Sequence, residues 1–210
     1  MTVQEEKKPY TSNEYVDLGL PSGLKWAKCN VGATSETEYG YYFQWGDIED
    51  KSKSDCSWRT YKHYNGSSDT LTKYNNSTSF GETLDNKTTL GLEDDAARAH
   101  MGNDWRMPTR DEFRELFDYT NNEWISNYKG TGVNGRKFTS KTNGNSIFIP
   151  ASGYRLGSSF RGQGRGGDVW SSSLNAALPG GALELGFGSD SIYMGDSGRY
   201  YGLAVRGVMD

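Results

Sequence analysis

Residues 183–202, LELGFGSDSIYMGDSGRYYG, contain the alternation that decides the fold. Apolar residues recur at every second position, first Leu183, Leu185 and Phe187 and then Ile192 and Met194. A period of two is typical of half-buried β-strands, so the stretch predicts two neighbouring strands with one face on a core. Glycine and small polar residues fill the positions between, although glycine weakens a strand and offers no side chain for packing. The need to fold explains why the alternating residues are apolar, but not why glycine and small polar residues stand between them.

The composition is that of a folded, loop-rich chain. Its 210 residues suit a single domain. Hydrophobic residues make up only 34% of the chain, yet 13% are aromatic, which argues against disorder. The net charge is -4 and no long basic run occurs, so we expect no nucleic-acid partner. No apolar run approaches the ~18 residues of a membrane span, and the first residues contain no secretory signal.

Turn and cap signals divide the chain into short elements. Residues 16–27 predict a hairpin around Pro21, and residues 47–87 are polar with no expected regular element. A first helix is expected from Leu92, with Gly102 as its C-cap. A second is capped by Thr109, with Glu112 completing a capping box. Short strands are expected at residues 136–140, 146–154, 169–173 and 202–208.

These elements predict an α+β fold with two short helices packed on short antiparallel strands and long loops. We expect residues 1–13 to form a flexible tail and residues 14–210 to form one domain. Within that domain, residues 155–202 have a distinct composition. Fourteen of the 27 glycines follow residue 152, no lysine follows Lys141, and Asn175 is the one asparagine after Asn145.

Several strings resemble one family over nearly the whole chain. They are VDLGLPSGLKWAKCNVGA, GYYFQWGD, DWRMPTRDEFREL, GYR and WSSS, and GLAVRGV is similar to the family's closing motif, with Gly207 in place of a proline. The chain resembles the FISUMP group, the major paralogous domain family. The resemblance implies a C-type-lectin-like fold.

Part of that family resembles the variable proteins of diversity-generating retroelements. In those proteins adenines of a C-terminal cassette are mutated, asparagine codons are favoured targets, and Lys, Glu, Gln, Met and Trp are not reached. The resemblance therefore implies that the outward residues form a diversified ligand-binding surface and that their glycines need no local structural reason. The candidate binding residues are Arg165, Asp168, Gly186, Gly188, Ser191, Tyr193, Gly195, Asp196, Ser197, Gly198, Arg199, Tyr200 and Tyr201.

Within this set the tyrosines are the expected anchors, because rigid aromatic side chains dominate binding surfaces of this composition. Arg199 is expected to pair with a ligand carboxylate. The partner is an unknown protein or surface ligand, and the oligomeric state stays open. The expected location is extracellular, at a cell surface or on a phage virion.

Two alternatives remain. One is a non-diversified bacterial surface or adhesion module of the same fold. The other is an enzyme of the formylglycine-generating type, which shares the fold but needs reactive cysteines in its C-terminal part, whereas no cysteine follows Cys56. His63 and His100 lack metal-ligand spacing with the cysteines, so we expect no catalytic residue, metal or cofactor. Cys29 and Cys56 could pair, although two unpaired buried thiols are favoured.

Overall fold

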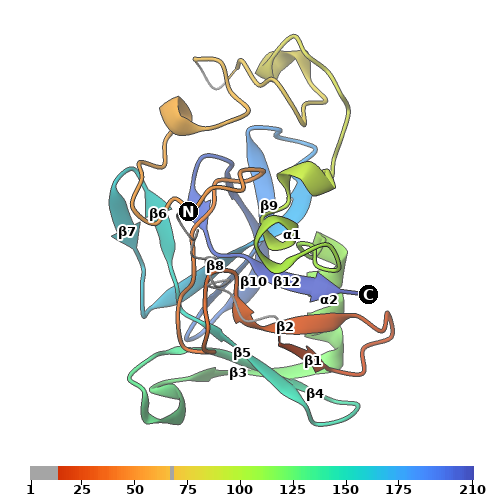
Figure 1. The fold of residues 1–210 in the computed structure, drawn as a ribbon, viewed down its shortest axis with the longest axis vertical. Coiled ribbons are helices and arrows are strands. Elements are labelled where there is room, and N and C mark those ends of the chain that lie inside the picture. Colours follow the sequence, from red (N-terminus) through yellow and green to blue (C-terminus); the bar gives the residue numbers. More distant parts are fainter. Residues whose placement is uncertain (1–13, 67–68) are drawn as a thin grey trace, which may run out of the picture.

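The computed structural model describes residues 14–66 and 69–210, so the expected tail at residues 1–13 lies outside the described residues. The described residues form four three-stranded antiparallel sheets and two α-helices (Figure 1). This is the α+β, strand-rich class that the sequence predicts.

The first sheet joins the two ends of the described chain. Strands β1 (Tyr15–Asp17) and β2 (Lys25–Asn30) form the predicted hairpin, and β12 (Arg206–Met209) pairs with β2 on its other side. Gly23 has a φ of +77°, which suits its place in the turn. The buried Arg206 side chain donates to the carbonyls of Ala27 and Phe148, both at 2.9 Å. The arginine of GLAVRGV therefore fixes the closing strand against β2.

The two helices begin where their caps are. Helix α1 (Ala96–Met101) follows a 3₁₀ turn at Leu92–Asp94 and begins after Asp95, whose carboxylate accepts from the Arg98 amide at 3.0 Å. The helix therefore starts later than expected. Helix α2 (Arg110–Tyr119) has the predicted capping box, because Glu112 Oε2 accepts from the Thr109 amide at 2.7 Å.

A second sheet underlies α2. Its strands are β3 (Thr120–Ile125), β4 (Gly135–Ser140) and β5 (Ser146–Pro150), and a 3₁₀ turn, η4 (Tyr128–Gly130), joins the first two. Phe113 and Leu116 of α2 pack with Phe138 of β4 in one hydrophobic core. The amphipathic face of α2 thus covers this sheet, as its spacing predicts.

The C-terminal third forms two further sheets. One has the order β10-β9-β8, from β8 (Gly166–Leu174), β9 (Gly181–Gly188) and β10 (Ile192–Gly198). The other has the order β11-β6-β7, from β6 (Tyr154–Leu156), β7 (Ser159–Arg161) and β11 (Gly202–Leu203). Val169 and Leu185 belong to the core under α2, whereas Trp170 and Ala182 belong to a second core, so β8 and β9 separate the two cores.

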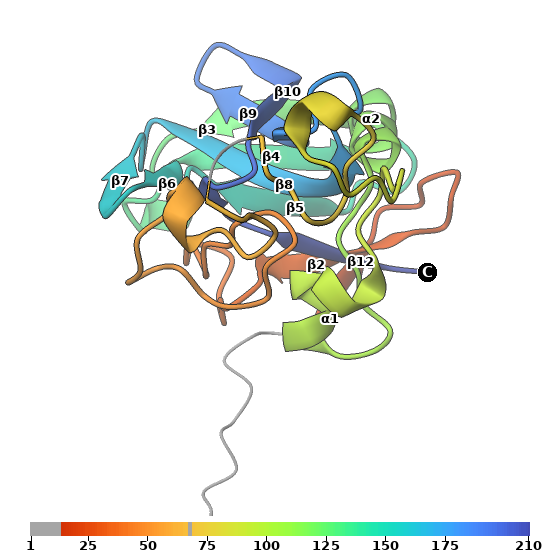
Figure 2. The ribbon, with the colours of Figure 1, turned by 90° about the horizontal axis from the view of Figure 1, so that it is seen from above.

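Residues 47–87, here called the excursion, carry only the 3₁₀ turns η1 (Trp58–Thr60) and η2 (Thr78–Phe80) among their described residues, as predicted (Figures 1 and 2). Asp94 ties the excursion to the segment before α1 by accepting from Lys62 at 2.7 Å, from Tyr74 at 2.7 Å and from Lys73. Burial opposes the ionisation of Asp94, but these hydrogen bonds outweigh it and hold its pKa at about 2. Among the described residues, no helix has the length and apolar character needed to cross a membrane.

Candidate functional site

The β9–β10 hairpin carries most of the predicted binding residues. Its strands pair with Tyr193 opposite Gly186 and Gly195 opposite Glu184, and β8 places Asp168 opposite Gly186 on the other side. Directly opposed residues share a face of a sheet. Asp168, Gly186 and Tyr193 therefore form one row on the face that we call the outward face.

The other face of the hairpin is scaffold. Leu185 and Phe187 are buried in the core under α2, and Ile192 and Met194 pack against that core while remaining partly exposed. This is the inward orientation that the alternation predicts. At this end of the sheet a two-layer division runs along both strands, with apolar residues on one face and Gly, Ser and Tyr on the other.

The hairpin tip is held by an arginine from outside it. Arg136 of β4 is 6% exposed, and its Nη2 donates to the carbonyls of Gly188 at 2.7 Å and Ser191 at 3.2 Å. Predicted residue Arg165 is exposed, just before β8, and a Cβ at Gly188 would lie 3.7 Å from its carbonyl oxygen. Arg165, Gly188 and Ser191 therefore gather at the tip.

Two glycines of the hairpin lie beneath the Tyr193 ring. A Cβ built on Gly186 would lie 2.5 Å from Tyr193 Cζ, and one on Gly195 would lie 2.9 Å from Tyr193 Cε2. The ring therefore covers both glycines, while Tyr193 itself is 50% exposed. The expectation that these glycines need no local structural reason is corrected: as they stand, they make room for an aromatic ring.

Glu184 is the residue of this face that the sequence argument missed. Its side chain is only 4% exposed. Because it alternates with Leu183 and Leu185, the sequence pattern places it on the polar face and gives no sign that it is buried. Burial, and then the nearby Asp168 charge, raise the pKa of Glu184 to about 8 despite a hydrogen bond from Ser197. Burial also raises the pKa of Asp168 to about 6.

Arg199 does not lie on the surface. It is fully buried, where its guanidinium donates to Tyr61 Oη at 2.7 Å and to the carbonyls of Lys73 and Pro179, both at 3.0 Å. The expectation that it pairs with a ligand carboxylate is therefore corrected. Its charge is engaged inside the protein, where it fastens the excursion to the turn before β9.

The remaining tyrosines lie in a separate aromatic cluster. The ring of Tyr200 lies 4.7 Å from Trp58 of the excursion and 4.7 Å from Tyr201, and Tyr201 stacks on Tyr154 at 5.5 Å. All four rings are partly exposed. Gly198 sits beneath Tyr200, since its Cβ would lie 2.6 Å from Tyr200 Cε1. The predicted residues thus form two patches, one around Tyr193 and one around Tyr200.

Two further predicted residues follow from the strand register. Ser197 shares the outward face and bonds to Glu184. Asp196 is exposed on the opposite face, paired with Leu183. The outward patch therefore comprises Asp168, Gly186, Gly188, Ser191, Tyr193, Gly195 and Ser197, together with Glu184.

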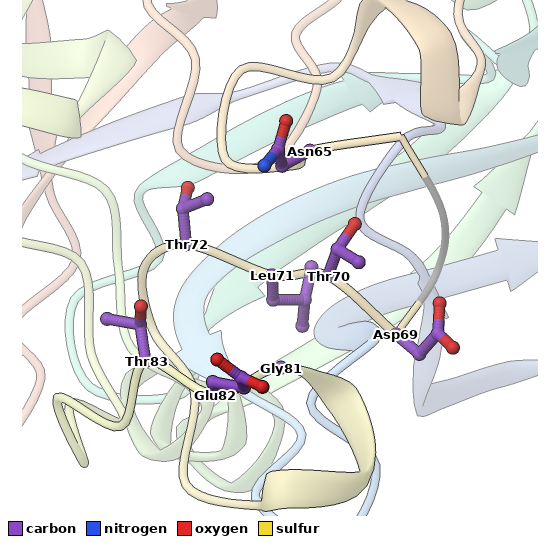
Figure 3. Close-up of a pocket in the computed structure, with 8 residues that line it drawn as sticks. All are labelled: Asn65, Asp69, Thr70, Leu71, Thr72, Gly81, Glu82 and Thr83. Carbon is purple, nitrogen blue, oxygen red and sulfur yellow. The ribbon is translucent and has the colours of Figure 1, made fainter.

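The excursion contains a depression of about 310 Å³ that no sequence pattern indicated (Figure 3). Its lining is polar except for Leu71 and consists of Asn65, Asp69, Thr70, Leu71, Thr72, Gly81, Glu82 and Thr83. Asp69 and Glu82 come from different segments of the excursion (Figure 3).

Cys29 and Cys56 are both buried and form no disulfide. Burial raises the pKa of the Cys56 thiol, which disfavours the reactive thiolate. Within the described ranges no group of three or more His, Cys, Asp or Glu side chains is placed to hold a metal ion.

No family model matches the chain, no curated protein matches it, and no solved structure matches it. Membership of the FISUMP group, expected from the motifs, stays a prediction.

Proposed function

We propose that the chain is a C-type-lectin-like protein that binds a protein or surface ligand through diversified outward residues of its C-terminal sheet, and that it catalyses no reaction. One observation carries the proposal. On the same hairpin, the residues of one face pack into a core while those of the other are short polar residues, glycines and a half-exposed tyrosine.

The outward glycines support this function because they can be substituted cheaply. The atoms that a new Cβ would meet most closely at Gly186 and Gly195 belong to the outer part of the Tyr193 ring, which is half exposed. Such rings can rotate away, whereas packed core atoms cannot. These positions therefore tolerate changes of side chain without loss of the fold, which is what a diversified surface requires.

The residue types also suit binding. Tyrosine supplies a large contact area at small entropic cost, and Ser and Gly adapt to many partners. Tyr193 is the exposed aromatic of the outward patch, and Tyr200 and Tyr201 extend an aromatic surface that includes Trp58. We infer that these tyrosines anchor the ligand.

The coding DNA tests the diversified reading. We expect it to lie beside a reverse transcriptase gene and a near-copy of the segment that encodes residues 155–202. The two copies should differ at adenines of the template, and the altered codons should be those of the outward residues. A locus with no such repeat would exclude diversification and favour a non-diversified adhesion module of the same fold, located at a cell surface or on a virion.

An enzyme of the formylglycine-generating type makes a different prediction. It requires a thiol that reacts, so replacing Cys29 and Cys56 by alanine would abolish the oxidation of a substrate-peptide cysteine. The binding function predicts that ligand capture survives these substitutions. The burial of both thiols supports binding over oxidation.

A further inference from the structure

Two carboxylates of the outward patch have no cationic partner. Asp168 and Glu184 lie on adjacent strands near Gly186 and the Tyr193 ring. Burial, and then the charges of these two carboxylates, raise the pKa of Tyr193. Glu184 accepts a hydrogen bond from Ser197, yet its Oε2 has no hydrogen-bond partner. Neither carboxylate lies within 4.0 Å of a Lys, Arg or His nitrogen in residues 14–66 and 69–210.

Such an arrangement is costly unless something else compensates for it. Removing a carboxylate from water is unfavourable unless it is paired and hydrogen-bonded, and two like charges nearby add to the cost. Elsewhere the same protein does pair its buried acids, since Asp94 is surrounded by Lys62, Lys73 and Tyr74. Asp95, which is also buried, has no ion pair but accepts from the amides of Arg98 and Met107, whereas Glu184 keeps one carboxylate oxygen without a hydrogen-bond partner.

We propose that Glu184 and Asp168 together bind one basic side chain, a lysine ammonium or an arginine guanidinium, that a protein ligand inserts beside Tyr193. The inference rests on the proposed binding function and names the chemistry that the surface recognises. Charge-assisted hydrogen bonds to a carboxylate are among the stronger polar contacts at interfaces. The Tyr193 ring offers a π face beside them, which also favours a cation.

A metal ion fits this patch less well. Calcium takes six to eight oxygen ligands. The patch offers two carboxylates and the Ser197 hydroxyl, and the described residues contain no cluster of three acids, histidines or cysteines. A single organic cation needs only the two carboxylates and the ring.

Access to Glu184 requires movement of the Tyr193 ring. The ring lies across Gly186 and Gly195, is 50% exposed and packs on no aromatic ring of the described residues within contact distance. Gly186 and Gly195 place no side chain between the ring and the sheet, so a shift of the ring would open a path to the Glu184 carboxylate. The carboxylate already approaches this space, since Glu184 Oε1 would lie 3.5 Å from a Cβ at Gly195.

The test uses N-acetyl-arginine amide as the cation and N-acetyl-citrulline amide as its uncharged analogue. Binding to the full chain is followed by NMR of the side-chain carboxyl carbons across a pH titration. We expect the arginine compound to bind and to lower the pKa of Glu184, whereas the citrulline compound does neither. Glu184→Gln and Asp168→Asn should each weaken binding about tenfold or more, the effect of losing one charged hydrogen bond. Asp190→Asn, at the exposed hairpin turn, is the matched control and should leave binding unchanged.

The proposal is overturned if both compounds bind equally, if neither binds, or if Glu184→Gln binds as well as the parent chain while keeping its amide spectrum. If calcium chloride alone shifts the carboxyl-carbon signals of Glu184 and Asp168, the patch is a metal site instead. The proposed function has a separate test, because it is contradicted if the gene lies beside no template repeat. If the protein binds the arginine compound but its gene has no such repeat, this inference stands and diversification is excluded.

Discussion

Glu184 holds its carboxylate almost entirely out of water, and this gives the molecule a pH dependence that can be measured. Its folded-state pKa of about 8 lies above the ordinary value of 4.5, so the folded state binds more protons than the unfolded state between these values. The contribution to stability is therefore greatest below pH 4.5 and is lost as the pH rises through 8. Asp168 acts in the same direction up to about pH 6.

Glu184→Gln should remove most of this dependence. The amide keeps the shape of the side chain without the charge, so we expect the variant to be more stable than the parent chain at pH 9, by on the order of 1–3 kcal/mol. Urea unfolding at pH 5 and pH 9 measures the difference. If the parent chain and the Glu184→Gln variant lose the same free energy of unfolding between pH 5 and pH 9, Glu184 is not a buried unpaired acid.

The glycines divide into two groups that alanine should separate. At Gly186 and Gly195 the new methyl group meets an exposed ring that can move, so we expect changes below about 1 kcal/mol. At Gly202 it would lie 2.8 Å from Cys56 Sγ, and at Gly207 2.8 Å from Met101 Sδ, both in the buried core. We expect losses of about 1–3 kcal/mol there. Thermal unfolding of the four alanine variants measures these losses of stability. Equal losses in the two groups would contradict this division of the glycines.

At the scale of elements, the excursion depends on Arg199. Its guanidinium donates to Lys73, Tyr74 and Tyr61 and lies over the Trp45 ring, 5.0 Å from the centroid. Arg199→Ala should leave buried carbonyls unpaired and cost about 3 kcal/mol or more. In limited proteolysis the Arg199→Ala variant should then be cut within residues 61–74. The control variant Arg161→Ala, an exposed change in β7, should be cut no faster than the parent chain. Equal resistance of the Arg199 variant would show that other contacts hold the excursion.

The elements also show what sequence patterns can reach. Thr109 and Glu112 predicted α2 because capping and periodicity act within a few residues. Strand β3 was missed because its residues are mostly polar and its pairing with β4 is made in space. For the same reason Arg199 was wrongly predicted to lie on the surface, and the burial of Glu184 was not predicted. Alternation predicts which face of a strand a residue lies on, but not whether other segments cover that face. Arg199 is covered by Tyr61 and Lys73, which lie far from it in the sequence.

At the scale of the molecule, β8 and β9 separate two hydrophobic cores, and the hairpin of β9 and β10 extends the sheet at its edge (Figure 2). One core supports the inward face of the hairpin, and Arg136 holds its tip. We therefore expect the fold to depend little on the outward side chains, apart from the buried Glu184. This independence is what would let a surface change while the scaffold stays constant.

A paired library on the displayed protein tests this claim most directly. One library varies Gly186, Gly188, Ser191, Tyr193, Gly195 and Ser197, and its matched control varies Leu185, Phe187, Ile192 and Met194. The measurement is the fraction of clones that resist protease. We predict that most outward clones stay folded and that few inward clones do. Similar losses in both libraries would contradict the division of the hairpin into scaffold and surface.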